Sequence, residues 1–332
     1  MILYDQEDTV SLDTFGILIP VHFSKAGTTL QTLRNHPLLG PREGEWLMPS
    51  REGGISQEDV LRAHTPEYVR RLFEQNTEAE IISTYELIAA DGSYHRYDPE
   101  RARGPLRGVL DRALARVSGT YQCCEHALDT GFCFYLGGGM HHAHPDQGKG
   151  FCLVNDIVIS LRRLQAEGRI QRAWVIDVDA HKGDGTAAMT REDPSIVTLS
   201  VHMAEGWPLD EDKVLPDGSP NPSFVPSDLD IPIGSGQEAK YQRALLDGLR
   251  HLEKYPRPDL ALVVQGADPF ELDELQSTAR IKLTLDQLLK RDQSIFTFLQ
   301  ERNIPQACLM AGGYGRETWR VYTQFLEWAL LS

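Results

Sequence analysis

Three side chains that could hold a metal follow a single apolar segment. Residues 173–186 read AWVIDVDAHKGDGT, in which a β-type run ends in Asp177, Asp179 and His181. On an extended chain, side chains two residues apart share a face. We therefore expect these groups to converge at the carboxyl end of a strand, where open α/β sheets place their ligand sites. Carboxylates and imidazoles together suit zinc or a harder divalent cation.

Other apolar runs end in the same kind of polar chemistry. The runs and the groups that follow them are 133–136 with His141 and His142, 260–265 with Asp268, and 307–310 with Tyr314. Glycines stand next to several of these polar groups, as expected for sharp turns or for close approach of the backbone to a ligand. The repetition predicts one site assembled from four strand ends.

Asp179, His181 and Asp268 form the candidate ligand set. Two carboxylates and one imidazole leave a coordination position for water and substrate, as catalytic zinc requires. Such a metal acidifies bound water and polarises an amide carbonyl. Two carboxylates also suit Fe²⁺ or another divalent ion, so the chemistry indicates a metal more strongly than it indicates zinc. The alternative is that these side chains are helix caps or solvated loop groups.

His141, His142 and Tyr314 are the candidate groups for proton transfer and charge stabilisation. A histidine that titrates near neutral pH can move protons during amide hydrolysis. A phenol on a turn can donate a hydrogen bond to an oxyanion. The alternatives are a structural pair of histidines and an ordinary turn tyrosine.

Six motifs, in order along the chain, together resemble the histone deacetylase family of the arginase/deacetylase superfamily. They are HTPEYV (64–69), GGGMHHAH (137–144), GFCLVND (150–156), DVDAHKGDG (177–185), GAD (266–268) and GGY (312–314). The segment AGGYGRET (311–318) looks closer to the class IV branch and to bacterial histone deacetylase-like amidohydrolases than to class I enzymes. It departs from the family's usual run of four glycines at Ala311.

The resemblance implies a role for each catalytic candidate. His142 would be the general base and acid, and His141 would assist it electrostatically. Asp177 and Asp184 would orient His141 and His142, respectively. Tyr314 would stabilise the tetrahedral intermediate opposite a Zn²⁺ ion held by the three candidate ligands.

The resemblance also implies a substrate tunnel and a second ion. Gly150, Phe151, Trp207 and Leu275 would line the tunnel. A structural K⁺ would be held by the residues that match the family's monovalent-cation site: Asp177, Asp179, His181, Ser200 and Val201. Leu275 stands where polyamine-selective relatives are expected to carry an acidic residue, although Glu271, Asp273 and Glu274 lie close by in the sequence.

Apolar β-like runs alternate with helical patterns along the chain, which is typical of a mainly parallel sheet with helices on both faces. We expect strands near 17–22, 133–137, 173–179, 196–201, 260–265 and 307–311. We expect helices at 108–130, 153–168, 237–254, 284–302 and 316–331, and long loops at 91–107 and 204–236. The resulting prediction is a three-layer α/β/α, arginase/deacetylase-like fold, with residues 1–332 forming a single catalytic domain.

Composition limits the partners and the compartment. Lys+Arg 33 against Asp+Glu 48 gives a formal net charge of −15, which disfavours direct binding to nucleic acid. The chain shows neither a signal-peptide pattern nor an apolar run long enough to span a membrane. The five cysteines lack zinc-finger spacing, which favours a reducing cytoplasm. A homo-oligomer is compatible with the sequence, but no feature identifies its interface.

The functional hypothesis is a zinc-dependent amidohydrolase that removes acyl groups from acyl-lysine side chains of proteins or peptides. The class IV likeness extends the range of substrates to longer acyl chains. The alternatives are a small-molecule amide or acetylpolyamine deacetylase and a non-catalytic protein that binds acyl-lysine. An arginase-type ureohydrolase fits less well, because Asp268 is followed by Pro269 and Phe270 instead of further metal ligands.

Overall fold

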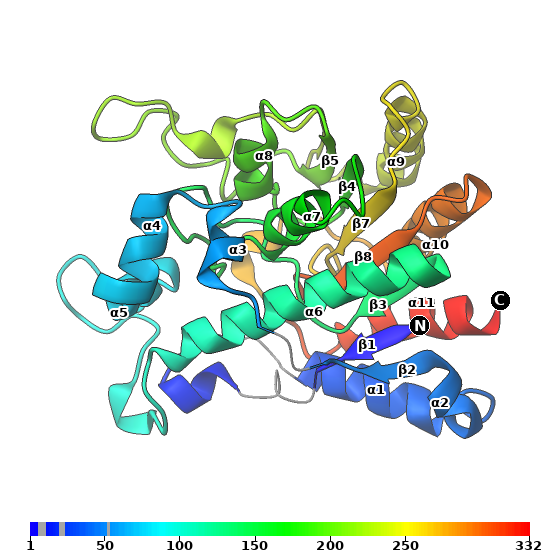
Figure 1. Ribbon diagram of the computed structural model, residues 1–332, viewed down its shortest axis with the longest axis horizontal. Helices are drawn as coiled ribbons and strands as arrows, with labels where there is room; N and C mark the ends of the chain where they lie inside the picture. Colours follow the sequence, from blue (N-terminus) through cyan, green and yellow to red (C-terminus); the bar gives the residue numbers. More distant parts are fainter. Residues whose placement is uncertain (6–10, 20–23, 52–53) are drawn as a thin grey trace.

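The computed structural model describes residues 1–5, 11–19, 24–51 and 54–332 (Figure 1). Its centre is an eight-stranded sheet in the order β2-β1-β3-β8-β7-β4-β5-β6. Every neighbouring pair is parallel. The strands are β1 (Ile2–Tyr4), β2 (Leu47–Pro49), β3 (Phe132–Tyr135), β4 (Ala173–Asp177), β5 (Ile196–Met203), β6 (Leu229–Ile233), β7 (Leu260–Gln265) and β8 (Gln306–Met310).

The α-helices cover the sheet and its edges, and α6 runs obliquely across the centre of Figure 1. They are α1 (Ser24–Asn35), α2 (Glu43–Trp46), α3 (Gln57–Leu61), α4 (Pro66–Arg70), α5 (Thr77–Thr84), α6 (Gly108–Thr130), α7 (Asp156–Ala166), α8 (Asp184–Thr190), α9 (Glu238–Leu252), α10 (Leu285–Glu301) and α11 (Trp319–Leu331). Short 3₁₀ turns lie at Leu12–Phe15, Gly40–Arg42, Pro99–Arg101, Pro222–Phe224 and Gln276–Thr278, and a π turn lies at Arg71–Gln75.

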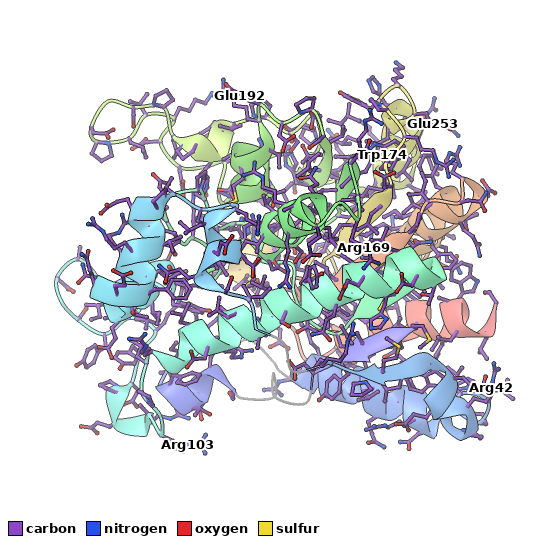
Figure 2. All side chains as sticks on the ribbon, in the orientation of Figure 1. Arg42, Arg103, Arg169, Trp174, Glu192 and Glu253 are labelled. Carbon is purple, nitrogen blue, oxygen red and sulfur yellow. The ribbon has the colours of Figure 1, made fainter. Side chains whose placement is uncertain are left out.

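Alternating side chains of the strands enter two different apolar cores. In β4, Trp174 and Ile176 pack with side chains from α1, α9, α10 and α11. Ala173 and Val175 of the same strand pack on the opposite face with side chains from α6 and α7. This two-residue alternation, with a helical layer on each face, confirms the three-layer α/β/α fold. Charged side chains such as those of Arg42, Arg103, Glu192 and Glu253 lie at the periphery (Figure 2).

The predicted strand at 17–22 is wrong in its described part. Ile17 makes an isolated bridge to Tyr97 and Leu18 belongs to no strand, whereas residues 20–22 lie outside the described residues. The predicted loop 204–236 contains β6, whose sequence is LDIPI. Pro232 lowers the strand signal of this segment, but proline is tolerated because β6 is an edge strand. The other five predicted strands and all five predicted helices are present within a few residues of their expected bounds.

The sequence patterns also missed several short elements. Strands β1 and β2 are three residues each, and helices α2 to α5 are at most eight residues long. Segments of this length are too short to show a clear periodicity. Within the described residues, no helix is both long and apolar enough to cross a membrane.

The ends of β4 and β7 are joined by the buried side chain of Arg291 on α10. Its Nη1 donates hydrogen bonds to the carbonyl oxygens of Val178, at 3.1 Å, and Gly266, at 2.7 Å. Its Nε donates to Asp292 at 2.7 Å, and both side chains of this ion pair are fully buried. Arg291 therefore fixes the two backbone segments that carry Asp179 and Asp268.

Replacing Arg291 with Met should lower the free energy of unfolding by about 3 kcal/mol, because the change leaves the Asp292 carboxylate buried without its partner. Arg291→Lys should lower it less, since a cation remains beside Asp292. Urea unfolding of the three proteins measures the effect. An unchanged unfolding midpoint in Arg291→Met would show that this guanidinium does not hold the strand ends together.

Candidate active site and metal centre

Asp179, His181 and Asp268 meet at the carboxyl ends of β4 and β7. One ligand atom from each lies within 4.8 Å of the others, and all three residues are buried. His181 Nδ1 is 3.3 Å from Asp179 Oδ1 and 3.2 Å from Asp268 Oδ2. Among the described residues, Asp268 Oδ2 has no partner that meets the geometry of a hydrogen bond. Two buried carboxylates directed at one imidazole nitrogen are a donor set that suits a divalent metal.

The surrounding backbone holds these ligands in place. Gly312 N donates to Asp179 Oδ2 at 3.0 Å, and Ala180 N donates to Asp268 Oδ1 at 2.9 Å. The other nitrogen of His181, Nε2, lies 3.1 Å from Ser277 Oγ, which leaves Nδ1 to face the carboxylates. A Cβ atom at Gly312 would come within 2.4 Å of Asp179 Oδ2. The glycine therefore makes room for the ligand oxygens.

The electrostatics of this cluster also fit a cation. Burial favours the neutral form of Asp179, but the charges of His141 and His181 hold the pKa of its carboxyl well below the usual range. Burial and the neighbouring Asp179 raise the pKa of Asp268 to about 7. Burial alone would lower the pKa of His181, but Asp179 and Asp268 outweigh it and raise this pKa to about 10. Without a metal, protons balance the carboxylates.

His141 and His142 follow β3 on a turn that Asp156 fixes. The Asp156 carboxylate accepts hydrogen bonds from Gly139 N at 2.9 Å and Met140 N at 2.6 Å. The two imidazole rings lie 4.0 Å apart between centroids. The turn thus presents both rings to the same space beside the three candidate ligands.

Each histidine of the pair has a carboxylate behind it. His141 Nδ1 is 2.7 Å from Asp177 Oδ2, and His142 Nδ1 is 2.7 Å from Asp184 Oδ1. These are the two pairings that the family resemblance implied. With Nδ1 engaged, Nε2 of each ring is the nitrogen available to a reacting group.

The two histidines differ in protonation. Burial lowers the pKa of His141, but Asp177 and Asp179 outweigh it and raise the pKa to about 9. Burial and the adjacent His141 lower the pKa of His142 to about 3, despite the opposing charge of Asp184. At neutral pH, His142 is therefore the neutral ring that can accept a proton, and His141 is the cation beside it.

Asp184 also contacts two residues that the sequence did not identify. Its Oδ2 lies 3.1 Å from His144 Nε2 and 3.4 Å from Lys149 Nζ. Lys149 in turn lies 2.7 Å from Glu211 and 5.3 Å from the centroid of the Trp207 ring. Lys149 thus connects the carboxylate behind His142 to the segment that carries Trp207.

Tyr314 follows β8, and its backbone is fixed from two sides. Tyr314 N donates to Asp273 Oδ2 at 2.7 Å. Lys25 Nζ on α1 donates to the carbonyl oxygens of Ala311, at 2.5 Å, and Gly313, at 3.3 Å. Burial and the nearby carboxylates of Asp179 and Asp268 raise the pKa of the Tyr314 phenol well above its usual value. Tyr314 therefore stays protonated and can donate a hydrogen bond.

The four expected tunnel residues line one cavity together with the reactive groups. Its walls are formed by Glu86, Arg96, His142, Gly150, Phe151, His181, Trp207, Leu275, Ser277 and Tyr314. The Trp207 ring lies 4.5 Å from the His142 ring and 5.6 Å from the His181 ring, between centroids. An apolar wall beside the reacting groups suits the methylene chain of a lysine-type amine.

Gly150 and Phe151, which line this cavity, both have an unusual backbone conformation. Gly150 has φ 56° and Phe151 has φ 65°, in the left-handed region that non-glycine residues seldom adopt. A Cβ at Gly150 would come within 2.4 Å of the Trp207 ring and 2.8 Å of the His142 ring. Only glycine fits at position 150, and the strained Phe151 directs its ring into the wall.

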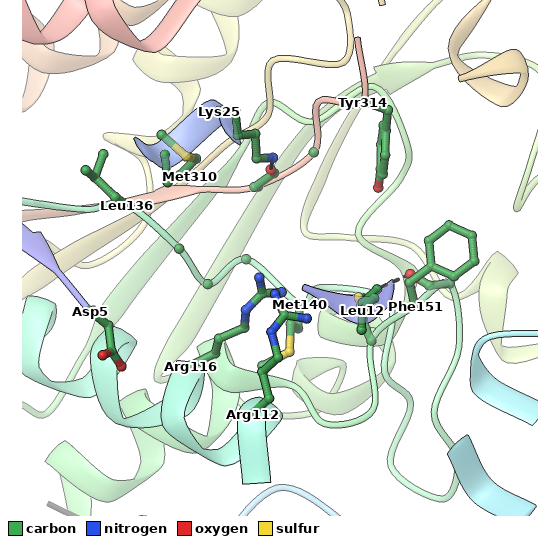
Figure 3. Close-up of a pocket in the computed structure, with 18 of the residues that line it drawn as sticks. Asp5, Leu12, Lys25, Arg112, Arg116, Leu136, Met140, Phe151, Met310 and Tyr314 are labelled. Carbon is green, nitrogen blue, oxygen red and sulfur yellow. Dashed lines mark hydrogen bonds between the residues drawn. The ribbon is translucent and has the colours of Figure 1, made fainter. Parts of the chain in front are cut away.

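A second cavity of about 120 Å³ adjoins the tunnel at Gly150, Phe151 and Tyr314 (Figure 3). Lys25 enters it from α1, and Arg112 and Arg116 reach toward it side by side from α6. Asp5 also lines it. This inner cavity therefore combines three cationic side chains with one carboxylate.

The expected monovalent-cation residues lie close together around the end of β4. Asp177 pairs with Ser200 in the register of β4 and β5, and both line a small cavity with Thr198 and Ser227. Ser200 Oγ has no hydrogen-bond partner in the described part of the chain. The K⁺ site stays a prediction.

Sequence reasoning missed the residues that support the site from a distance. They are Lys25, Glu86, Arg96, His144, Lys149, Glu211, Ser277 and Arg291. His144 lay in a recognised motif. The other seven carry no local signal: Glu86 and Arg96 pair with each other across one loop, and the remaining five contact residues far away in the sequence.

Comparisons with known proteins place the chain in one family. The family model of the histone deacetylase domain matches residues 20–327. An uncharacterized protein of Picosynechococcus is 32% identical over 210 residues, covering 63% of this chain and 65% of that protein. Histone deacetylase 2 of Arabidopsis thaliana is 26% identical over 272 residues, covering 82% and 65%. The acetoin utilization protein AcuC of Staphylococcus aureus is 30% identical over 205 residues, covering 60% and 50%. The chain thus spans half to just under two thirds of the length of these relatives.

Zinc binding to the metal-free protein should release about one proton at pH 7.5, because His181 must lose the proton that its raised pKa holds. The affinity for zinc should therefore rise by about tenfold per pH unit around neutrality. Calorimetric titrations in buffers of different ionisation enthalpy measure the number of protons. A binding enthalpy that is the same in every buffer would contradict this assignment of His181 as a ligand.

Proposed function

The chain belongs to the histone deacetylase family, and from this premise we propose that it is a metal-dependent amidohydrolase acting on acyl-lysine. It would cleave the amide C–N bond with one water molecule, giving the free amine and a carboxylate. The observation that carries the proposal is the common cavity of His142, His181 and Tyr314. In this cavity, a proposed proton acceptor (His142), a proposed metal ligand (His181) and a hydrogen-bond donor (Tyr314) line the same wall.

Asp179, His181 and Asp268 would hold the metal, which would polarise the amide carbonyl and acidify a water molecule. His142 is suited to take the proton of the water at Nε2, because Asp184 engages its Nδ1 and the ring lines the cavity. The same nitrogen can then deliver the proton to the leaving amine. Tyr314 would donate a hydrogen bond from its phenol to the oxygen on which negative charge develops, and would keep its proton.

Each remaining residue has a supporting role in this proposal. The positive charge of His141, stabilised by Asp177, favours the build-up of negative charge nearby. Phe151, Trp207 and Leu275 would enclose the methylene chain of the lysine and exclude water. We take Zn²⁺ as the resident metal and K⁺ as the structural ion near Ser200. We also take residues 1–332 as one catalytic domain.

The chemistry of the inner cavity supports short acyl groups over fatty ones. Lys25, Arg112 and Arg116 line the space behind Tyr314 where a longer acyl chain would extend. An alkyl chain placed against these side chains would displace water from them and would offer no hydrogen bond in return. We therefore propose acetyl or a similarly short acyl group as the substrate, in place of the longer chains that the class IV likeness suggested.

Among the alternatives, hydrolysis of small-molecule amides keeps support from the same site. Leu275 in the tunnel wall argues against a preference for acetylpolyamines, because a cationic substrate gains nothing from an apolar side chain there. A ureohydrolase with two metals lacks support, since the described residues offer one cluster of three ligands. Five buried free cysteines support a reducing cytoplasm as the compartment.

Tyr314→Phe should lower kcat for a zinc-loaded acetyl-lysine peptide by about 10²- to 10³-fold, the usual loss when an oxyanion donor is removed. His142→Ala should lower it by about 10²- to 10⁴-fold through loss of the proton acceptor. Amine release from acetyl-, butyryl-, octanoyl- and myristoyl-lysine peptides measures both losses and the preferred acyl length.

Tyr255→Phe and His251→Ala remove the same groups from a surface away from the cavity and should leave kcat unchanged. If kcat fell equally in the control variants and the site variants, the loss would be due to impaired folding and not to a missing catalytic group. Turnover that survives in both site variants would overturn the proposed mechanism, and preference for myristoyl-lysine would overturn the proposed acyl length.

A further inference from the structure

The exposed end of the tunnel carries two opposite charges. The lining residues His142 and His181 are buried, whereas Glu86 is exposed and Arg96 is half-buried. This gradient of exposure places the reacting groups at the inner end and the Glu86–Arg96 pair at the mouth. The side chains of these two residues form an ion pair with each other.

Local structure holds both residues at the mouth. His95 N donates to Leu87 O at 2.9 Å, and an antiparallel bridge joins Ile88 to Tyr94, so residues 86–96 form a closed loop with the ion pair at its base. The Arg96 guanidinium lies 5.3 Å from the centroid of the Phe151 ring. Phe151 is a tunnel wall, so its contact with Arg96 fixes the cation beside the path that a substrate takes.

We propose that the preferred substrate is a free acylated amino acid, an Nε-acyl-L-lysine with an unblocked α-carbon. Its α-carboxylate would bind Arg96 and its α-ammonium would bind Glu86, while its acyl amide reaches the inner end of the tunnel. This proposal rests on the proposed amidohydrolase function and adds the identity of the group outside the tunnel.

The charge pattern of the mouth separates this substrate from its competitors. A lysine within a peptide has uncharged amides at its α-carbon, so it could form an ion pair with neither residue. An acylated diamine offers an ammonium to Glu86 but no anion to Arg96. A free acyl-lysine supplies both charges on one carbon atom, which matches two adjacent side chains of opposite sign. Charge-assisted hydrogen bonds of this kind favour Arg with carboxylates.

Four acetyl amides with the same methylene chain test the proposal through one readout, the release of acetate by the zinc-loaded protein. They are Nε-acetyl-L-lysine, N-acetylcadaverine without the carboxylate, 6-acetamidohexanoate without the ammonium, and an acetyl-lysine capped at both α-groups. The free amino acid should have the highest kcat/KM. Each missing charge should lower kcat/KM by about fivefold, the size of an exposed ion pair.

Substitutions at Arg96 and Glu86 test which charge of the substrate each of these side chains binds. Arg96→Met should remove the advantage that the carboxylate gives, and Glu86→Gln should remove the advantage that the ammonium gives. Both effects are read as ratios of kcat/KM to that of the capped substrate in the same variant, so a general change in activity cancels. Arg42→Met breaks a comparable surface ion pair, with Glu45 at 2.9 Å, and should change none of the ratios. High salt should reduce the preference in the wild-type protein, because exposed charges are screened.

The outcomes separate this inference from the function on which it rests. Equal or faster hydrolysis of the capped substrate would overturn the inference and leave the amidohydrolase intact. A preference for the free amino acid that survives in both Arg96→Met and Glu86→Gln would also overturn it. Absence of acetate release from all four compounds and from acetyl-lysine peptides would overturn the proposed function itself.

Discussion

The site depends on holding two buried carboxylates side by side. Asp179 and Asp268 both approach His181 Nδ1 within 3.3 Å, away from bulk water. Their ligand atoms lie within 4.8 Å of each other. Like charges at that distance repel in a buried environment, and burial by itself favours the neutral form of each carboxyl. The raised pKa of Asp268 relieves part of this repulsion, and the rest calls for a positive charge between the two carboxylates. His181 supplies it as a cation when no metal is present, and a divalent ion supplies it with the imidazole neutral.

The parallel sheet makes this arrangement accessible. Its order places β3, β8, β7, β4 and β5 next to one another, so their carboxyl ends bring together groups that are far apart in the sequence. Strand interiors supply burial, whereas the turns that follow supply the reactive side chains. Arg291 spans the ends of β4 and β7 by bonding to carbonyl oxygens, and so stiffens the backbone under both carboxylates without touching them. Lys25 acts in the same way on the backbone before Tyr314.

Sequence reasoning reaches furthest where the signal is local. Asp177, Asp179 and His181 lie at or just after the end of β4, and their spacing behind an apolar run marked them as candidates for one site. It failed where the role of a residue depends on a contact with a residue that is distant in the sequence. Lys149 and Glu211 are 62 residues apart, and nothing near either one indicates the other. The edge strand β6 was not predicted because its proline weakens the strand pattern. Glu86 and Arg96 could be recognised as candidates for substrate binding only after the structure placed both in the wall of the cavity.

Anomalous diffraction from a crystal of the zinc-loaded protein, recorded on both sides of the zinc absorption edge, tests the central claim most directly. The account predicts one strong peak at about 2.0 to 2.3 Å from His181 Nδ1 and from a carboxylate oxygen each of Asp179 and Asp268. Its remaining coordination position should open toward His142 and Tyr314. A zinc peak bound elsewhere, or one that contacts His181 through Nε2, would contradict the account.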